Sequence, residues 1–138
     1  MGGAQVMGFG IKRNATDALF SDLVRERANW RCERCLTQYE KPAPGLHCSH
    51  FYGRGGKSTR WDFDNANALC FKCHTYLGSN PHEYRVWKLR QLGQRLYDRL
   101  VLRANTPTKI DEKMVRLGLK TEWKRIQADL KFKIIGAR

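Results

Sequence analysis

Apolar and polar residues recur along the chain with two different periods, and this pattern predicts helices towards both ends and a short hairpin between them. Near the N-terminus, Leu19 and Leu23 stand at helical spacing, with charged residues around them. Thr16 or Asp17 is suited to cap this helix, so we expect it to run to about residue 29.

The middle of the chain carries shorter apolar stretches. Residues 46–52 are predicted to form a strand, and residues 63–69 a second strand or extended piece. Between them, residues 53–58 are rich in glycine and basic residues, which favours a turn. A helical segment is expected to open at Cys70.

The last third of the chain has a helical pattern. Pro81 suits the first turn of a helix that extends to about Leu92, and residues 94–103 repeat the apolar spacing. After residues 106–108, which include a proline, one or two more helices are expected. The elements together predict an α+β fold.

The net charge of the chain indicates which class of binding partner it has. The 138 residues carry 26 lysines and arginines against 13 acidic residues, a formal charge of +13. From Pro81 onward 15 basic residues face six acidic ones, so the excess lies mainly in the helical region. A field of this sign favours a polyanion such as nucleic acid, although a merely soluble basic protein is the alternative. No stretch has the length of a membrane span or the pattern of a secretory signal, so we expect a cytoplasmic protein with no membrane partner.

Four of the five cysteines form two Cys-x-x-Cys pairs, and Cys48 is left over. The paired residues are Cys32, Cys35, Cys70 and Cys73. Two such turns supply four thiolates, the ligand set of a closed structural zinc site. The 34 residues between the pairs are enough for a hairpin, whose base the zinc would clamp. The alternatives are unrelated or redox-active thiol pairs, and c-type haem attachment at Cys70–His74, which would leave the first pair unexplained.

Inside this clamp the chain resembles the HNH, or ββα-metal, endonuclease family. The resemblance spans about residues 29–80 and is carried by His50, Asn65 and His74, with the run Asp64–His74 matching the second half of the motif. It implies that His50 is the general base of DNA hydrolysis, that Asn65 orients His50 through the backbone, and that His74 binds a catalytic divalent metal, Mg²⁺ or Mn²⁺. A neutral imidazole suits the first role, and a cation offsets charge on the phosphate.

One position departs from many HNH sites, which have an Asp or His before the base as a second metal ligand. Here that residue is Ser49, a poor ligand for a divalent cation. Glu83, His47, Asp62 and Asp64 are candidates to replace it. We favour Glu83, because it opens a helix shortly after the second cysteine pair.

A narrower resemblance points to the NinG/Rap family of phage recombination proteins, which act on branched DNA. It is carried by residues 47–51, 58–62 and 83–85 and covers about residues 31–105. It implies cleavage of Holliday junctions or D-loops in the cytoplasm of a bacterial host by a phage or prophage protein. Symmetric cuts at a junction would favour a homodimer.

The residue pattern and these resemblances together divide the chain into a flexible tail (residues 1–14), a zinc-bound HNH core with adjoining helices (15–105) and a basic helical extension (106–138), of which the extension lies outside both resemblances. Two other functions remain open. One is a nicking or double-strand HNH nuclease for restriction, packaging or homing, and the other is a non-catalytic zinc module that binds DNA.

Basic residues around the glycine-rich turn are the predicted DNA contacts. Arg54, Lys57 and Arg60 flank the hairpin where phosphates would approach. Trp61 is expected to be a core residue, with stacking on an unpaired base as the alternative.

Overall fold

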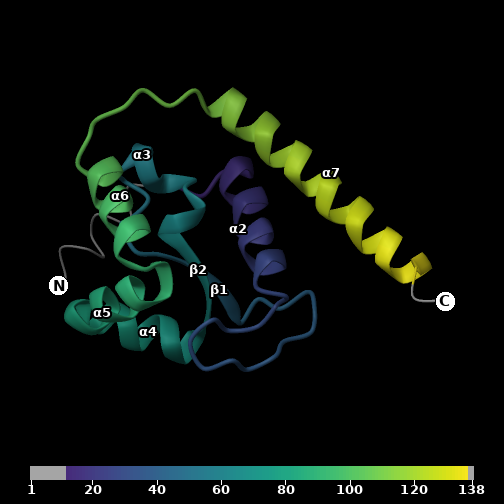
Figure 1. Cartoon of the computed structure of the whole chain (residues 1–138), viewed down its shortest axis with the longest axis horizontal. Helices are drawn as coiled ribbons and strands as arrows, with labels where there is room; N and C mark the ends of the chain where they lie inside the picture. The colour runs from purple at the N-terminus through teal and green to yellow at the C-terminus, as the bar shows by residue number, and fades with distance from the viewer. Residues whose placement is uncertain (1–11, 137–138) are drawn as a thin grey trace.

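The computed structural model describes residues 12–136, and within them six α-helices surround a two-stranded antiparallel hairpin (Figure 1). The strands are β1 (Leu46–His50) and β2 (Ala66–Cys70), paired so that the first residue of β1 lies opposite the last residue of β2. The predicted α+β class and the hairpin are confirmed. Most of the predicted tail, residues 1–11, lies outside the described residues.

The first described helix, α2 (Ala15–Arg27), is capped by a residue other than those predicted. The side chain of Asn14 accepts a hydrogen bond from the Asp17 N–H, and the Asp17 carboxylate accepts one from the Asn14 N–H, each at 2.9 Å. The predicted cap at Thr16 or Asp17 was therefore wrong, because this reciprocal capping box begins at Asn14. Thr16 instead lies buried in the first turn.

Between the strands the chain forms two short helical pieces. They are α3 (Lys57–Arg60) and a 3-10 turn (Phe63–Asn65). The second strand was predicted from residue 63, but its first three residues form this turn. The N-cap of the turn is Asp62, whose carboxylate accepts from the Asp64 N–H.

Three helices follow the hairpin almost without linkers. They are α4 (Phe71–Ser79), α5 (Pro81–Leu92) and α6 (Gln94–Ala104). Pro81 occupies the first turn of α5, as predicted. The corner between α5 and α6 is Gly93, whose φ of 84° is one that residues with a side chain rarely adopt. The predicted boundaries of these helices agree with the structure to within a residue or two.

The two faces of the hairpin contact different helices, because side chains alternate along a strand. Cys48 and His50 face α2: Ser21 of this helix and the nearby arginines partly offset the burial that raises the pKa of Cys48, and the rings of His50 and Phe20 are 5.8 Å apart. His47 and Ser49 point to the other face, which α4 and α5 cover. Residues that are neighbours in sequence therefore have separate surroundings.

The outer edge of β2 is covered by side chains and by the first cysteine turn. Glu33 uses both its backbone and its side chain here: its N–H donates to the Ala68 carbonyl at 2.8 Å, and its carboxylate accepts from the Ala68 N–H at 2.6 Å. Arg27 of α2 donates to the Ala66 carbonyl at 2.6 Å. The backbone groups of β2 that point away from β1 at these two residues thus have partners.

A single helix, α7 (Glu112–Gly136), forms the C-terminal part, where one or two were predicted. It packs against α2 on the side away from the hairpin (Figure 1). The Glu112 carboxylate accepts hydrogen bonds from Asn14 and Thr16, which join the N-terminal ends of the two helices. No helix in the described part of the chain has the length and apolar character needed to cross a membrane.

Candidate metal centre and hairpin site

Four sulfur atoms from the two cysteine turns converge beside the end of the hairpin. The Sγ atoms of Cys32, Cys35, Cys70 and Cys73 all lie within 4.8 Å of one another, and those of Cys35 and Cys70 are 3.8 Å apart. Zn–S bonds of about 2.3 Å in a tetrahedron require sulfur atoms about 3.8 Å apart. The cluster is therefore able to hold a metal ion, and its donor set and spacing fit zinc. It is the only group of three or more such ligands among residues 12–136.

Hydrogen bonds to sulfur follow the same pattern in both turns. The N–H groups of Cys35 and Cys73 each point to the Sγ of the first cysteine of their own turn, at 3.5 Å. Arg34 links the two turns, because its guanidinium lies 3.4 Å from the Cys73 sulfur. These donors offset negative charge on thiolate sulfur.

The thiols of the cluster differ in how readily they ionise. A hydrogen bond with Thr37 lowers the pKa of Cys35 to about 6, whereas burial raises the pKa of Cys73. Four thiolates this close repel one another, and a divalent cation among them removes that repulsion.

His50 ends β1 and is held by the backbone of the following segment. Its Nε2 lies 3.0 Å from the Arg60 carbonyl. A carbonyl only accepts, so Nε2 carries the proton and Nδ1 keeps the lone pair. Burial lowers the pKa of His50, the carbonyl opposes this shift, and the nearby charge of Arg54 adds to it. The imidazole is therefore neutral at pH 7.

Asn65 fastens the segment between the strands at both of its ends. This side chain is fully buried; it accepts from the Tyr52 N–H and donates to the carbonyls of Tyr52 and Thr59, at 2.8 to 3.0 Å. Thr59 directly precedes Arg60, whose carbonyl holds His50. The position of Asn65 is compatible with its predicted role of orienting His50, and that role stays a prediction.

A buried carboxylate that sequence reasoning missed organises the same segment. Asp17 of α2 is 3 % exposed and accepts from the Arg60 guanidinium at 2.6 and 3.0 Å and from the Trp61 indole at 3.0 Å. Despite its burial, these donors and that of Asn14 lower the pKa of Asp17. Its sequence position suggested only a helix cap.

The four residues predicted to contact DNA phosphates or to stack on a base are placed differently, and Asp17 contacts all of them except Lys57. Arg60 was expected to meet phosphate, but its side chain is 9 % exposed and is committed to Asp17. Trp61 packs against the core, as expected. Lys57 is exposed, and Arg54 is partly buried 3.9 Å from the Asp17 carboxylate.

His74 lies on the opposite face of the hairpin from His50. Its ring stacks on that of His47, with centroids 5.1 Å apart and planes 10° from parallel. Its Nδ1 is buried without a hydrogen-bond partner among the described residues. Burial and the neighbouring His47 lower the pKa of His74, so the ring is neutral and offers lone-pair nitrogen. Such a nitrogen is a suitable metal ligand.

The candidates for a second catalytic ligand have different surroundings. Asp62 and Asp64 both bind Arg103 of α6, at 2.6 and 3.1 Å. Glu83 is exposed on α5 and belongs to no metal-ligand group among the described residues. Of the four candidates, His47 is the one in ring contact with His74.

Ser49 does not face an open site. Its hydroxyl is buried and lies 2.7 Å from that of Tyr84 on α5. On the same face, the fully buried Lys88 donates to Asn67 at 2.7 Å, and Asn67 donates to Glu33 at 3.0 Å. Sequence reasoning missed this network, because a lysine on a helix is usually exposed.

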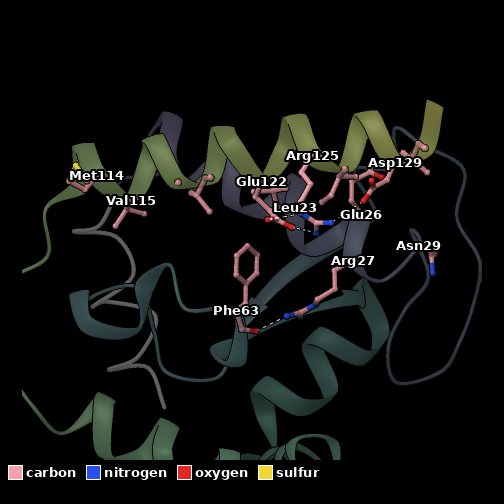
Figure 2. A pocket seen from close by; sticks show the side chains of 14 residues that line it. Leu23, Glu26, Arg27, Asn29, Phe63, Met114, Val115, Glu122, Arg125 and Asp129 are labelled. Atoms are coloured by element: carbon pink, nitrogen blue, oxygen red, sulfur yellow. Dashed lines mark hydrogen bonds and ion pairs between the residues drawn. The ribbon is translucent and has the colours of Figure 1, made fainter. Parts of the chain in front are cut away.

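A groove of about 700 Å³ lies between α7 and α2 (Figure 2). Its floor is mostly apolar and includes Leu23 and Phe63. Glu122 and Arg125, which pair with each other, stand at its α7 side. Through Phe63 the groove borders the segment that connects the two strands.

Comparison of the chain with models of known protein families, with curated proteins and with solved structures gives no match.

Proposed function

We propose that this chain is a metal-dependent HNH endonuclease that hydrolyses phosphodiester bonds in DNA, with His50 as the general base. The observation that carries the proposal is the hydrogen bond from His50 Nε2 to the Arg60 carbonyl, 3.0 Å long. It fixes the tautomer, so that Nδ1 can take a proton from water. The lowered pKa of His50 keeps this nitrogen unprotonated at neutral pH.

The surroundings of His50 support a rigidly held base. The buried Asn65 closes the segment that carries the Arg60 carbonyl, and Asp17 holds the Arg60 side chain. A base that is oriented before the substrate arrives loses little freedom in the transition state. The four-cysteine cluster would keep the hairpin in place by binding structural zinc.

His74 would hold the catalytic cation, and the orphaned, buried Nδ1 is the observation that fits it for this role. A bound Mg²⁺ or Mn²⁺ supplies positive charge that offsets the charge building on the phosphate and the leaving oxygen. Glu83 stays the proposed second ligand, with His47, whose ring lies against that of His74, as the alternative. The net charge of +13 favours the approach of DNA.

The proposed substrate is branched DNA, such as a Holliday junction or a D-loop. This part rests on the resemblance of residues 47–51, 58–62 and 83–85 to the NinG/Rap proteins, which also leads us to propose a phage or prophage origin and action in the host cytoplasm. A nicking or double-strand nuclease would cut a matched linear duplex equally well. Cleavage of a four-way junction and of that duplex, compared with Mg²⁺ and with Mn²⁺, separates the two.

A zinc module that only binds DNA is the second candidate, and one observation favours it. His50 and His74 lie on opposite faces of the hairpin, His50 towards α2 and His74 towards His47. The general base and the catalytic cation must act on one phosphate, so cleavage requires them to approach the same end of the hairpin.

The deciding experiment compares His50→Ala with His82→Ala, a matched control at an exposed histidine of α5. We expect His50→Ala to keep DNA binding and to lower the cleavage rate on the order of 100- to 10,000-fold, while the control cuts normally. His74→Ala should also lose cleavage, with partial recovery at high metal concentration. If His50→Ala cuts like the parent, the proposed base is wrong and the binding module is the better assignment.

A further inference from the structure

Four exposed lysines form one straight line along α7. They are Lys113, Lys120, Lys124 and Lys131, and we call them the lysine track. Their spacings of seven, four and seven residues, at 100° per residue, place all four within about 40° of one another around the helix. At 1.5 Å per residue the track is about 27 Å long.

The lysine track differs from the other basic residues of the helix in what it contacts. Arg116 pairs with Glu112, and Arg125 pairs with Glu122 and Asp129. By contrast, no hydrogen bond or ion pair joins a track side chain to any residue in the described part of the chain. The arginines are used within the helix, whereas the lysines offer their charge to solvent.

The packing of α7 keeps the lysine track facing outward. Leu119 is buried against the core, and Val115 and Ile126 pack beside it. This apolar face lies about 140° around the helix from the track. Figure 2 shows the face directed towards α2, and Figure 1 shows α7 along the outside of the body. The exposed apolar residues of α7, Met114, Leu117 and Leu130, lie at different angles around the helix, so they form no continuous apolar face to insert into a lipid bilayer.

We propose that the lysine track binds the phosphate backbone of duplex DNA outside the cleavage site. This inference rests on the proposed function for the identity of the polyanion. The length of the track corresponds to about eight base pairs at 3.4 Å each. Lysine is a flexible point charge, so the contact adds affinity and orientation without reading sequence. The C-terminal helix is thus an arm that holds DNA flanking the cut.

The test neutralises the track and measures how DNA binding depends on salt. The track variant changes all four lysines to glutamine, which has a similar helix propensity, so α7 should stay folded. A matched control removes the same charge from four exposed residues of other helices. Its changes are Lys72→Gln, Arg90→Gln, Arg95→Gln and Arg99→Gln. Binding to a 30-base-pair duplex is measured with the zinc-bound full chain, without added Mg²⁺ or Mn²⁺.

Neutralising four phosphate contacts should reduce the slope of log K against log salt by about 3 to 4 in the track variant. The control should change the slope by less than one. We also expect the affinity of the parent, but not of the track variant, to rise as duplex arms are lengthened to about eight base pairs. Equal slopes in parent and track variant would overturn the inference, and so would an equal reduction in the control.

Two further outcomes keep this inference distinguishable from the proposed function. A parent that binds DNA through the track but never cuts it would defeat the nuclease proposal and leave the track standing. A parent that cuts DNA while the track variant keeps the full salt slope would support the nuclease proposal and overturn the lysine track. Track-dependent binding to phosphatidylserine vesicles, with no effect on DNA, would show the partner to be a membrane surface and overturn the inference.

Discussion

Replacing Lys88 with methionine should change the pH dependence of folding stability in a defined way. Lys88 belongs to α5, and its side chain is fully buried against Asn67 of β2. This burial lowers the pKa of Lys88 from 10.5 to about 8. A shift of this size corresponds to about 3 kcal/mol of unfavourable free energy when the folded protein keeps the lysine charged. Above pH 8 the folded state releases its proton while the unfolded chain still holds one. The stability of the parent should therefore rise with pH between about 8 and 10.5.

The assay is urea unfolding of the zinc-bound chain at pH 7, 8, 9 and 9.5, followed by circular dichroism. The linkage relation predicts a gain of about 2 kcal/mol for the parent between pH 7 and 9.5 from Lys88 alone. Lys88→Met loses this gain, so the stability of the variant relative to the parent should fall by that amount. The variant also leaves Asn67 without its lysine donor, which costs about 1 kcal/mol at every pH and does not affect the slope.

Other groups that titrate in this range are common to both proteins and cancel in the difference. An exposed lysine provides the control: Lys124→Met should give a curve parallel to that of the parent. If the difference between Lys88→Met and the parent stays constant from pH 7 to 9.5, Lys88 is not a buried ammonium with a lowered pKa.

Two more predictions concern the cluster and the base. Cys70→Ser should reduce the number of zinc ions bound per chain well below one and unfold the hairpin. The control Cys48→Ser should keep the metal. A folded Cys70→Ser protein with one zinc ion per chain would contradict the proposal that zinc clamps the hairpin. Asp17→Asn removes the charge that raises the pKa of His50 and leaves Arg60 unopposed, so the acid limb of the cleavage profile should move to lower pH. Asp22→Asn on the same helix should leave the profile in place, and a profile unmoved in Asp17→Asn would show that Asp17 has only a structural role.

The sequence predicted a helix start or a metal-ligand cluster well where residues close together in the chain determine it. Pro81 marked the start of α5, and the two Cys-x-x-Cys pairs predicted the cluster, because ligand spacing within a turn is a local property. The start of β2 was less accurate, since residues 63–65 have strand-like composition but form a turn capped by Asp62.

The contacts that surround the candidate site depend on distant parts of the chain and could not be predicted. Asp17 and Arg60 are 43 residues apart, and their ion pair removes from solvent an arginine expected to meet phosphate. Lys88 and Asn67 meet because α5 turns back onto the hairpin. The placement of His50 and His74 on opposite faces depends on which helix covers each face, which alternation alone does not tell.

The covered edge of β2 links metal binding by the cysteine cluster to the resistance of the protein to aggregation. Glu33 holds this edge, and it stands between two of the cysteines of the cluster, Cys32 and Cys35. Loss of the metal would loosen that turn and uncover the hydrogen-bonding groups of a short apolar strand. Other chains could then pair with the exposed strand. If the cluster binds zinc as proposed, chelation of the metal or oxidation of the thiols should therefore lead to concentration-dependent aggregation.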